Sequence, residues 1–357
     1  MRLREPRSYF PYVLASAWSF PWPRHKCEEL GDAWRDPQHL VSNGPFVLAE
    51  LADDHALLRA NPHWEGPHGN VREIHVAFEG SHAELAERWR QGEFDILQST
   101  DPSVRDAADT LAEVVPARGT YYIAYRAGAP PFSNELVRKA FSHALDRRVI
   151  GAAVAPLARP ATRGGAIPPA IPGHSHRVAP EYDLELARSL LAQAGYPGGK
   201  GLPELEFLVP SWVQDASIFL EQWGALGARL HVRHAQMHAL TEIPAGAHLW
   251  LHAFAVDYPD PDGFFRGFLR TDAPYGFVGD DEIVEMADRA RGLRDQSERM
   301  HLYHEIDRLF VAERAAILPL FYGRTLLVRR PWVEELWANP MSGAHFDQVV
   351  IRRPSGS

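Results

Sequence analysis

The sequence has only one cysteine, Cys27, in 357 residues. A single thiol excludes an internal disulfide framework and a metal cluster held by several thiolates. No run of about 18 uninterrupted apolar residues occurs, so we expect no membrane-spanning helix. The chain also lacks a Lys/Arg run, and its net charge of −9 and pI near 6.0 argue against a nucleic-acid-binding protein.

No secretory signal is visible at the start of the sequence. The first residues include several arginines, the apolar part is broken by Pro11, and no cleavage region follows. The length of 357 residues suits about two domains, and the contents of 45% hydrophobic and 23% charged residues are typical of a folded globular protein. Because no secretory signal is visible, a cytoplasmic location of the chain as written stays open.

Local patterns predict an α/β protein. Residues 46–51 and 56–59 suit a β-hairpin, and Ser133 or Asn134 is expected to cap a helix with an apolar face at Val137 and Phe141. Residues 151–180 are rich in Gly, Pro and Ala and show little periodicity, which favours a crossover into a second domain. Beyond them, strand and helix patterns alternate.

Eighteen histidines suggest a metal site, but their spacing does not support one. His231 lies on a predicted strand and His238 beyond it, so the two do not converge on one face. His301 and His304 do not form a His-Glu-x-x-His motif, because the glutamate comes after the second histidine. No nucleophile, base and orienting group emerge together either. We therefore predict no metal, no cofactor and no enzymatic activity.

The most informative stretch is 248–269. It starts with an apolar run whose length suits a buried strand. Three carboxylates follow within six positions, Asp257, Asp260 and Asp262, and aromatic residues come after them. A strand that ends in carboxylates can build a small-molecule site in an open α/β sheet. From spacing alone, a binding site and a solvated acidic turn both stay open.

Aromatic residues are the second signal. Tyr121, Tyr122 and Tyr125 belong to one predicted strand, with Tyr121 and Tyr125 on the same face because side chains alternate along a strand. Trp250 and Tyr258 lie in the 248–269 stretch. Most large aromatic residues are core residues, but a cleft lined by aromatic rings and a few carboxylates would bind a peptide-like or sugar-like ligand.

Nine segments match one family pattern in the same order along nearly the whole chain. They are VSNGPFVL (41–48), RANPHW (59–64), GEFDI (92–96), YYIAY (121–125), PFSNELVRKAFSHALDR (131–147), AGYPGGKGLP (194–203), DYPDPD (257–262), LYHE (302–305) and ILPLFY (317–322). Together they resemble the family 5 extracellular solute-binding proteins, the dipeptide, oligopeptide and nickel receptors of ABC importers. Each motif alone is loose, and their order makes the match specific.

The resemblance implies a two-lobed α/β fold of the periplasmic-binding-protein type (type II) that closes on its ligand. Residues 1–150 would form the remainder of the first lobe, with residues 1–40 from the edge of a small extra subdomain. Residues 151–330 would form the second lobe, and residues 331–357 would return to the first. Family members usually have more residues before the point that matches Met1, so the chain is expected to be incomplete at its N-terminus.

The resemblance also implies the ligand and its contacts. Asp257 matches the position that pairs with the free α-amino group of a peptide, and Tyr121 and Tyr122 would line the cleft. Tyr258 and Trp250 would support them. The expected ligand is a short peptide or another amine-bearing solute, bound between the lobes. If the full-length form is exported, the expected partners are the permease subunits of an ABC transporter, in the periplasm or at the cell surface.

Two other functions stay open at this point. The missing signal sequence is compatible with a cytoplasmic solute-sensing domain of a regulator. The histidine content is compatible with a receptor for nickel or another metal chelate.

Overall fold

A computed structural model describes Leu3 and residues 5–78, 80–236, 243–269 and 280–353. Within these ranges no helix is long and apolar enough to cross a lipid bilayer. The chain divides into two compact units. The larger comprises Met1–Ser16 and Pro116–Arg324, and the smaller comprises Ala17–Val115 and Thr325–Ser357. The division falls inside two long strands, β5 (Leu111–Tyr125) and β10 (Ile317–Arg329), so each strand contributes to both units.

The two units have other boundaries than the domains expected at residues 150 and 330. Residues 116–150 group with the following segment because β5 pairs with β9 (Leu249–Ala255), and because two helices after β5 pack into the same core. These helices are α4 (Glu135–His143) and α5 (Arg147–Val154). The assignment of the expected segments to lobes of a binding protein stays a prediction.

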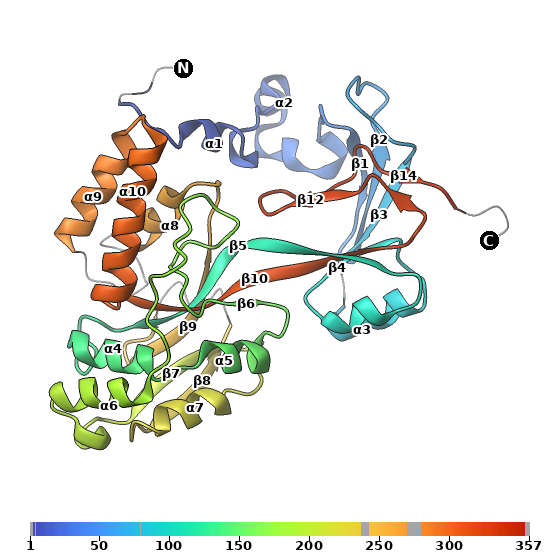
Figure 1. The fold of residues 1–357 in the computed structure, drawn as a ribbon. Helices are drawn as coiled ribbons and strands as arrows, with labels where there is room; N and C mark the ends of the chain where they lie inside the picture. The colour runs from blue at the N-terminus through green and yellow to red at the C-terminus, as the bar shows by residue number, and fades with distance from the viewer. Residues whose placement is uncertain (1–2, 4, 79, 237–242, 270–279, 354–357) are drawn as a thin grey trace. The chain divides into compact units, whose positions relative to one another are not determined.

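One mixed sheet organises the larger unit (Figure 1). Its strands follow the order β4-β10-β5-β9-β7-β8, with the short β6 beside β10. The antiparallel pair β5–β9 places Tyr122 opposite His252 and Ala124 opposite Trp250, whereas β7 runs parallel to β8 and β9. The remaining strands of the larger unit are β6 (Arg159–Pro160), β7 (Leu205–Pro210) and β8 (Leu230–Ala235). The strand β4 (Ile96–Ser99) belongs to the smaller unit, where it pairs with the end of β10. The apolar run after His248 is thus a buried strand, as predicted, and it lies between β5 and β7 in the sheet.

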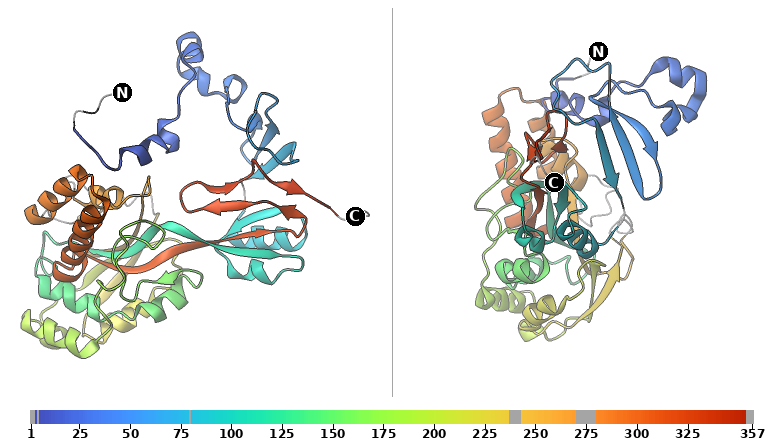
Figure 2. Two further views of the ribbon diagram at one scale, coloured as in Figure 1. Left: turned by 45° about the horizontal axis from the view of Figure 1, so that its top comes forward. Right: turned by 90° about the vertical axis from the view of Figure 1, so that its right-hand side faces the viewer.

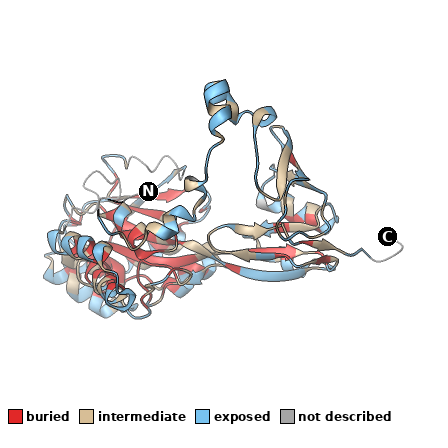
Figure 3. Ribbon diagram, turned by 90° about the horizontal axis from the view of Figure 1, so that it is seen from above, coloured by how far each residue is buried: buried red, intermediate tan, exposed pale blue. Residues whose placement is uncertain are grey.

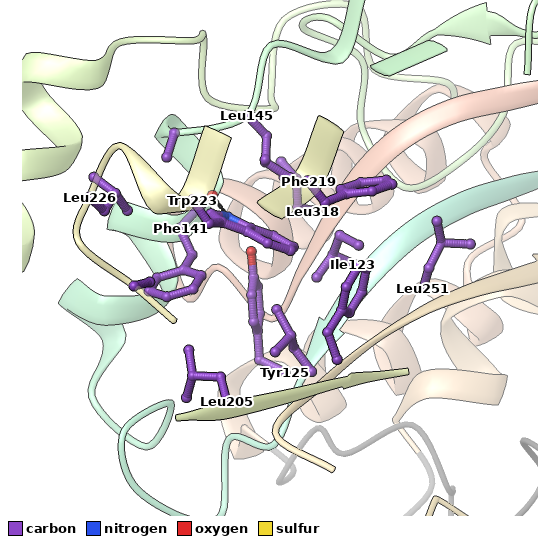
Figure 4. Close-up of a cluster of buried hydrophobic side chains, with 14 of the residues drawn as sticks. Ile123, Tyr125, Phe141, Leu145, Leu205, Phe219, Trp223, Leu226, Leu251 and Leu318 are labelled. Carbon is purple, nitrogen blue, oxygen red and sulfur yellow. Dashed lines mark hydrogen bonds between the residues drawn. The ribbon is translucent and has the colours of Figure 1, made fainter. Parts of the chain in front are cut away.

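Helices cover one face of this sheet and enclose the main core. Besides α4 and α5 they are α6 (Leu184–Gln193) and α7 (Ser217–Gly224). Trp223 lies among the core side chains, and its indole N–H donates to the carbonyl oxygen of Phe141 at 3.0 Å (Figure 4). The predicted helix is confirmed: Asn134 caps α4, and Val137 and Phe141 are fully buried.

Three helices follow β9 and form a second layer in the larger unit. They are α8 (Pro261–Phe268), α9 (Asp281–Gly292) and α10 (Gln296–Asp307), and α10 continues as a π-helical turn over Arg308–Glu313. Phe264 and Phe268 of α8 pack on Phe254 of β9, with ring centroids 5.2 and 5.5 Å away. In both views of Figure 2, α9 and α10 lie next to each other.

The smaller unit contains a three-stranded antiparallel sheet, and the predicted hairpin is confirmed as its first two strands. These strands are β1 (Phe46–Leu51), β2 (His55–Ala60) and β3 (Glu73–Ala77). Its helices are α2 (Arg24–Leu30) and α3 (His82–Arg90), and α1 (Phe10–Leu14) belongs to the larger unit. Short strand pairs complete it: β11 (Val333–Glu334) with β14 (Val350–Ile351), and β12 (Trp337–Asn339) with β13 (Gly343–His345). Figure 3 marks the buried residues in red, and they lie in helices as well as in strands.

Candidate functional site

Asp257 lies in the loop that joins β9 to α8. The strand ends at Ala255, and α8 starts at Pro261 with Asp260 as its N-cap residue. The Asp257 side chain is exposed, and it has no hydrogen-bond or ion-pair partner among the residues that the structure describes. A carboxylate in this position is available to a cationic group of a ligand.

The two other carboxylates of the loop are buried in ion pairs. Asp260 is 1% exposed and accepts two hydrogen bonds from the Arg299 guanidinium, both at 2.6 Å. Asp262 is fully buried and accepts from Nε of Arg291 at 2.5 Å. Asp260 and Asp262 are therefore not part of a solvated acidic turn, and Asp260 also caps α8. The reason is that α9 and α10 bring arginines against the loop from about thirty to forty residues away in sequence.

Two tyrosines complete this buried network. The Tyr258 hydroxyl donates to Oδ2 of Asp262 at 2.9 Å, and the Tyr303 hydroxyl donates to Oδ1 of the same carboxylate at 3.4 Å. Burial, reinforced by the Asp262 charge, raises the pKa of both phenols above their usual range. Both groups consequently stay protonated donors at neutral pH. The loop that carries Asp257 is thus held from its buried side by short, charge-assisted hydrogen bonds.

Tyr121 and Tyr122 lie on opposite faces of β5. Tyr121 is half-buried, its ring stacks on Phe321 at 4.8 Å, and it meets Trp212 edge-on at 5.6 Å. Burial raises the pKa of its phenol. Tyr122 is fully buried and lies within hydrogen-bond distance of Nδ1 of His252 at 3.1 Å. Of these two tyrosines, only Tyr121 is partly exposed.

Trp250 is paired with Ala124, and Ala124 lies two residues after Tyr122 on β5. Trp250 and Tyr122 therefore lie on the same face of the sheet. It is 1% exposed, and its indole N–H has no hydrogen-bond acceptor among the described residues. Of the five predicted site residues, the structure therefore places Asp257 beside Tyr258, and Tyr122 with Trp250 in the interior. Tyr121 stands apart on the other face, and the ligand-binding role of all five stays a prediction.

Arg291, Arg299 and Tyr303 were missed in the sequence. They lie on α9 and α10, and nothing in their local pattern marks them as partners of the DYPDPD motif. The only available signal is indirect: a loop with three carboxylates requires cations if it is buried. Within the described part of the chain, no group of three or more His, Cys, Asp or Glu side chains is arranged to hold a metal ion.

Comparison with known proteins identifies relatives of the same kind. The model of the family "Bacterial extracellular solute-binding proteins, family 5 Middle" matches residues 1–276. The probable deoxycholate-binding periplasmic protein YgiS of Escherichia coli is 24% identical over 349 residues, and the periplasmic oligopeptide-binding protein OppA of Salmonella typhimurium is 25% identical over 359 residues. Each match covers 93% of this chain and 64% of the relative, so the chain spans less than two thirds of their length.

Solved structures show the same fold. The periplasmic binding protein DppA from Helicobacter pylori, in complex with the peptide STSA, superposes with a TM-score of 0.82 at 21% identity. This match covers 98% of the chain and 72% of DppA. The predicted α/β fold of the two-lobed periplasmic-binding-protein type is thereby confirmed.

Proposed function

Because this chain belongs to the bacterial extracellular solute-binding proteins, family 5, we propose that it is the ligand-binding component of an ABC-type importer. Its proposed ligands are short peptides or similar solutes with a free amino group. Relatives in the same fold are named for oligopeptides, and two of the solved structures hold the peptides STSA and Met-Leu. The permease subunits of such an importer are the proposed protein partners, outside the cytoplasm.

The observation that supports this proposal most directly is the state of Asp257. Its neighbours Asp260 and Asp262 are paired with Arg299 and Arg291, whereas Asp257 is exposed and has no partner among the described residues. An ammonium group that leaves water needs a carboxylate partner, and hydrogen bonds to charged groups stabilise by about 1.5–3 kcal/mol. In the proposal, Asp257 binds the amino group of the ligand.

The other predicted site residues take supporting roles in this proposal. Tyr258 follows Asp257 directly, and its hydrogen bond to Asp262 fixes the loop, so the anchor needs little reorganisation on binding. Tyr121 offers the exposed part of its ring to an apolar portion of the ligand. Tyr122 and Trp250 act from the interior by packing the β5–β9 pair on which the loop rests.

Replacing Asp257 with asparagine tests the proposal. The variant keeps the size of the side chain but loses its charge, so we expect peptide affinity to fall by about 10- to 100-fold. Isothermal titration calorimetry with an equimolar mixture of short peptides measures the effect. Asp281→Asn is the matched control, since Asp281 is an exposed aspartate of α9 in the same unit. Absence of saturable heat with the unaltered protein contradicts the function, and undiminished affinity in Asp257→Asn contradicts the anchor.

A further inference from the structure

An open cavity of about 410 Å³ lies in the larger unit, against α8, α9 and the segment before α1. Three of its lining residues are arginines: Arg7, Arg266 and Arg291. The other three are Tyr9, Leu269 and Val284. No carboxylate is among the lining residues that the structure describes. The cavity therefore combines three positive charges with a tyrosine ring and two aliphatic side chains.

Arg291 is held in place by acidic residues outside the cavity. Its Nε donates to the buried Asp262 at 2.5 Å, and its Nη1 donates to Asp288. Its Nη2 has no acceptor among the described residues, and the side chain is 18% exposed. A guanidinium fixed on one edge in this way presents its remaining donors at low conformational cost.

The N-terminal side of the cavity is tied to the same helices. The Tyr9 ring stacks on Tyr258 with centroids 5.5 Å apart, and the Ser8 N–H donates to the carbonyl oxygen of Arg291 at 3.4 Å. The Ser8 hydroxyl also donates to the carbonyl oxygen of Leu293. The buried network around Asp262 therefore orders both Arg291 and, through Tyr258, the aromatic wall of the cavity.

Of the two remaining arginines, only Arg266 adds a charge that no described carboxylate neutralises. Arg266 lies in the last turn of α8, is exposed, and has no carboxylate partner in the described part of the chain. Among the residues that the structure describes, Arg7 pairs only with the exposed Glu5, at 2.5 Å. Arg7 and Arg291 already pair with carboxylates that do not line the cavity, so Arg266 supplies the charge that a bound anion neutralises.

We propose that this cavity is a binding site for a small organic anion, with a carboxylate or phosphate monoester group held by the arginines and an apolar body packed against Tyr9, Leu269 and Val284. The planar arginine fork matches both carboxylate and phosphate oxygens. The site is separate from the proposed peptide anchor, because it depends on positive charge and does not include Asp257.

Calorimetry with phenyl phosphate and phenylacetate at low ionic strength tests the site. We expect saturable binding of at least one probe, and the stronger of the two identifies the preferred anion. Replacement of Arg266 with glutamine should weaken binding at least about tenfold, and added salt should weaken it further. Arg266→Gln is expected to fold normally, because Arg266 has no partner to lose among the described residues.

Two further variants make the result specific. Arg289→Gln removes an exposed arginine of α9 that does not line the cavity, so it should bind the probes like the unaltered protein. Asp257→Asn should also keep probe binding even if it loses peptides, which separates this proposal from the transport function. The proposal is overturned if neither probe binds, or if Arg266→Gln binds as tightly as Arg289→Gln.

Discussion

Replacing Asp260 with alanine is expected to destabilise the protein by about 3–5 kcal/mol, because it leaves the Arg299 guanidinium buried without its counter-charge. Both side chains of the pair are almost completely buried, at 0% for Arg299 and 1% for Asp260, and they share two hydrogen bonds of 2.6 Å. The helix α8 also loses its N-cap. Urea unfolding followed by tryptophan fluorescence measures the change in the free energy of unfolding.

Asp288→Ala is the matched control for this experiment. Asp288 also pairs with an arginine, Arg291, but its side chain is 64% exposed, so its removal should cost less than about 1 kcal/mol. The double variant Asp260→Leu/Arg299→Met should recover much of the stability, since an apolar pair has no charge to desolvate. Equal losses in Asp260→Ala and Asp288→Ala would contradict a special role for the buried pair.

Replacing Asp307 with asparagine is expected to stabilise the protein at pH 7.5 by up to about 3 kcal/mol and to have little effect at pH 4. Asp307 is fully buried at the end of α10, and this burial raises the pKa of its carboxyl to about 6, although the hydrogen bond from the Ala166 N–H partly opposes the shift. An unfolded chain titrates this group near 3.8. The folded protein thus binds more protons between about pH 4 and 6, and the contribution of Asp307 to stability falls as pH rises through that range.

The buried His252 has the opposite pH dependence. Its burial lowers the pKa of the imidazole from 6.5 to about 4, so its contribution to stability is lost as pH falls through that interval. In the unaltered protein, the pH dependences of stability due to Asp307 and His252 oppose each other. The difference in unfolding free energy between Asp307→Asn and the unaltered protein therefore isolates the contribution of the Asp307 carboxyl. Unfolding free energies measured from pH 4 to 8 provide this difference. A difference that does not change with pH would contradict the assignment.

Much of the local structure was predictable. Asn134 before an apolar face at Val137 and Phe141 predicts α4 because capping and helical periodicity act within one turn or two. The apolar run of β9 was also long enough to be recognised as a buried strand. The order of nine motifs identified the family, and Asp257 was singled out by its match to the amine-binding position.

The tertiary structure determines which charged and aromatic side chains are buried and which are exposed. Alternation along β5 determines that Tyr121 and Tyr122 face opposite ways, but only the packing of Phe268 and His252 shows that Tyr122 is the fully buried one. Likewise, three carboxylates in one motif are equivalent by composition. The fold separates them, because α9 and α10 bring Arg291 and Arg299 to Asp262 and Asp260 and leave Asp257 exposed. Short-range patterns determine the helices and strands of this protein, and long-range electrostatic pairing determines which carboxylates of the loop are buried and which one stays exposed.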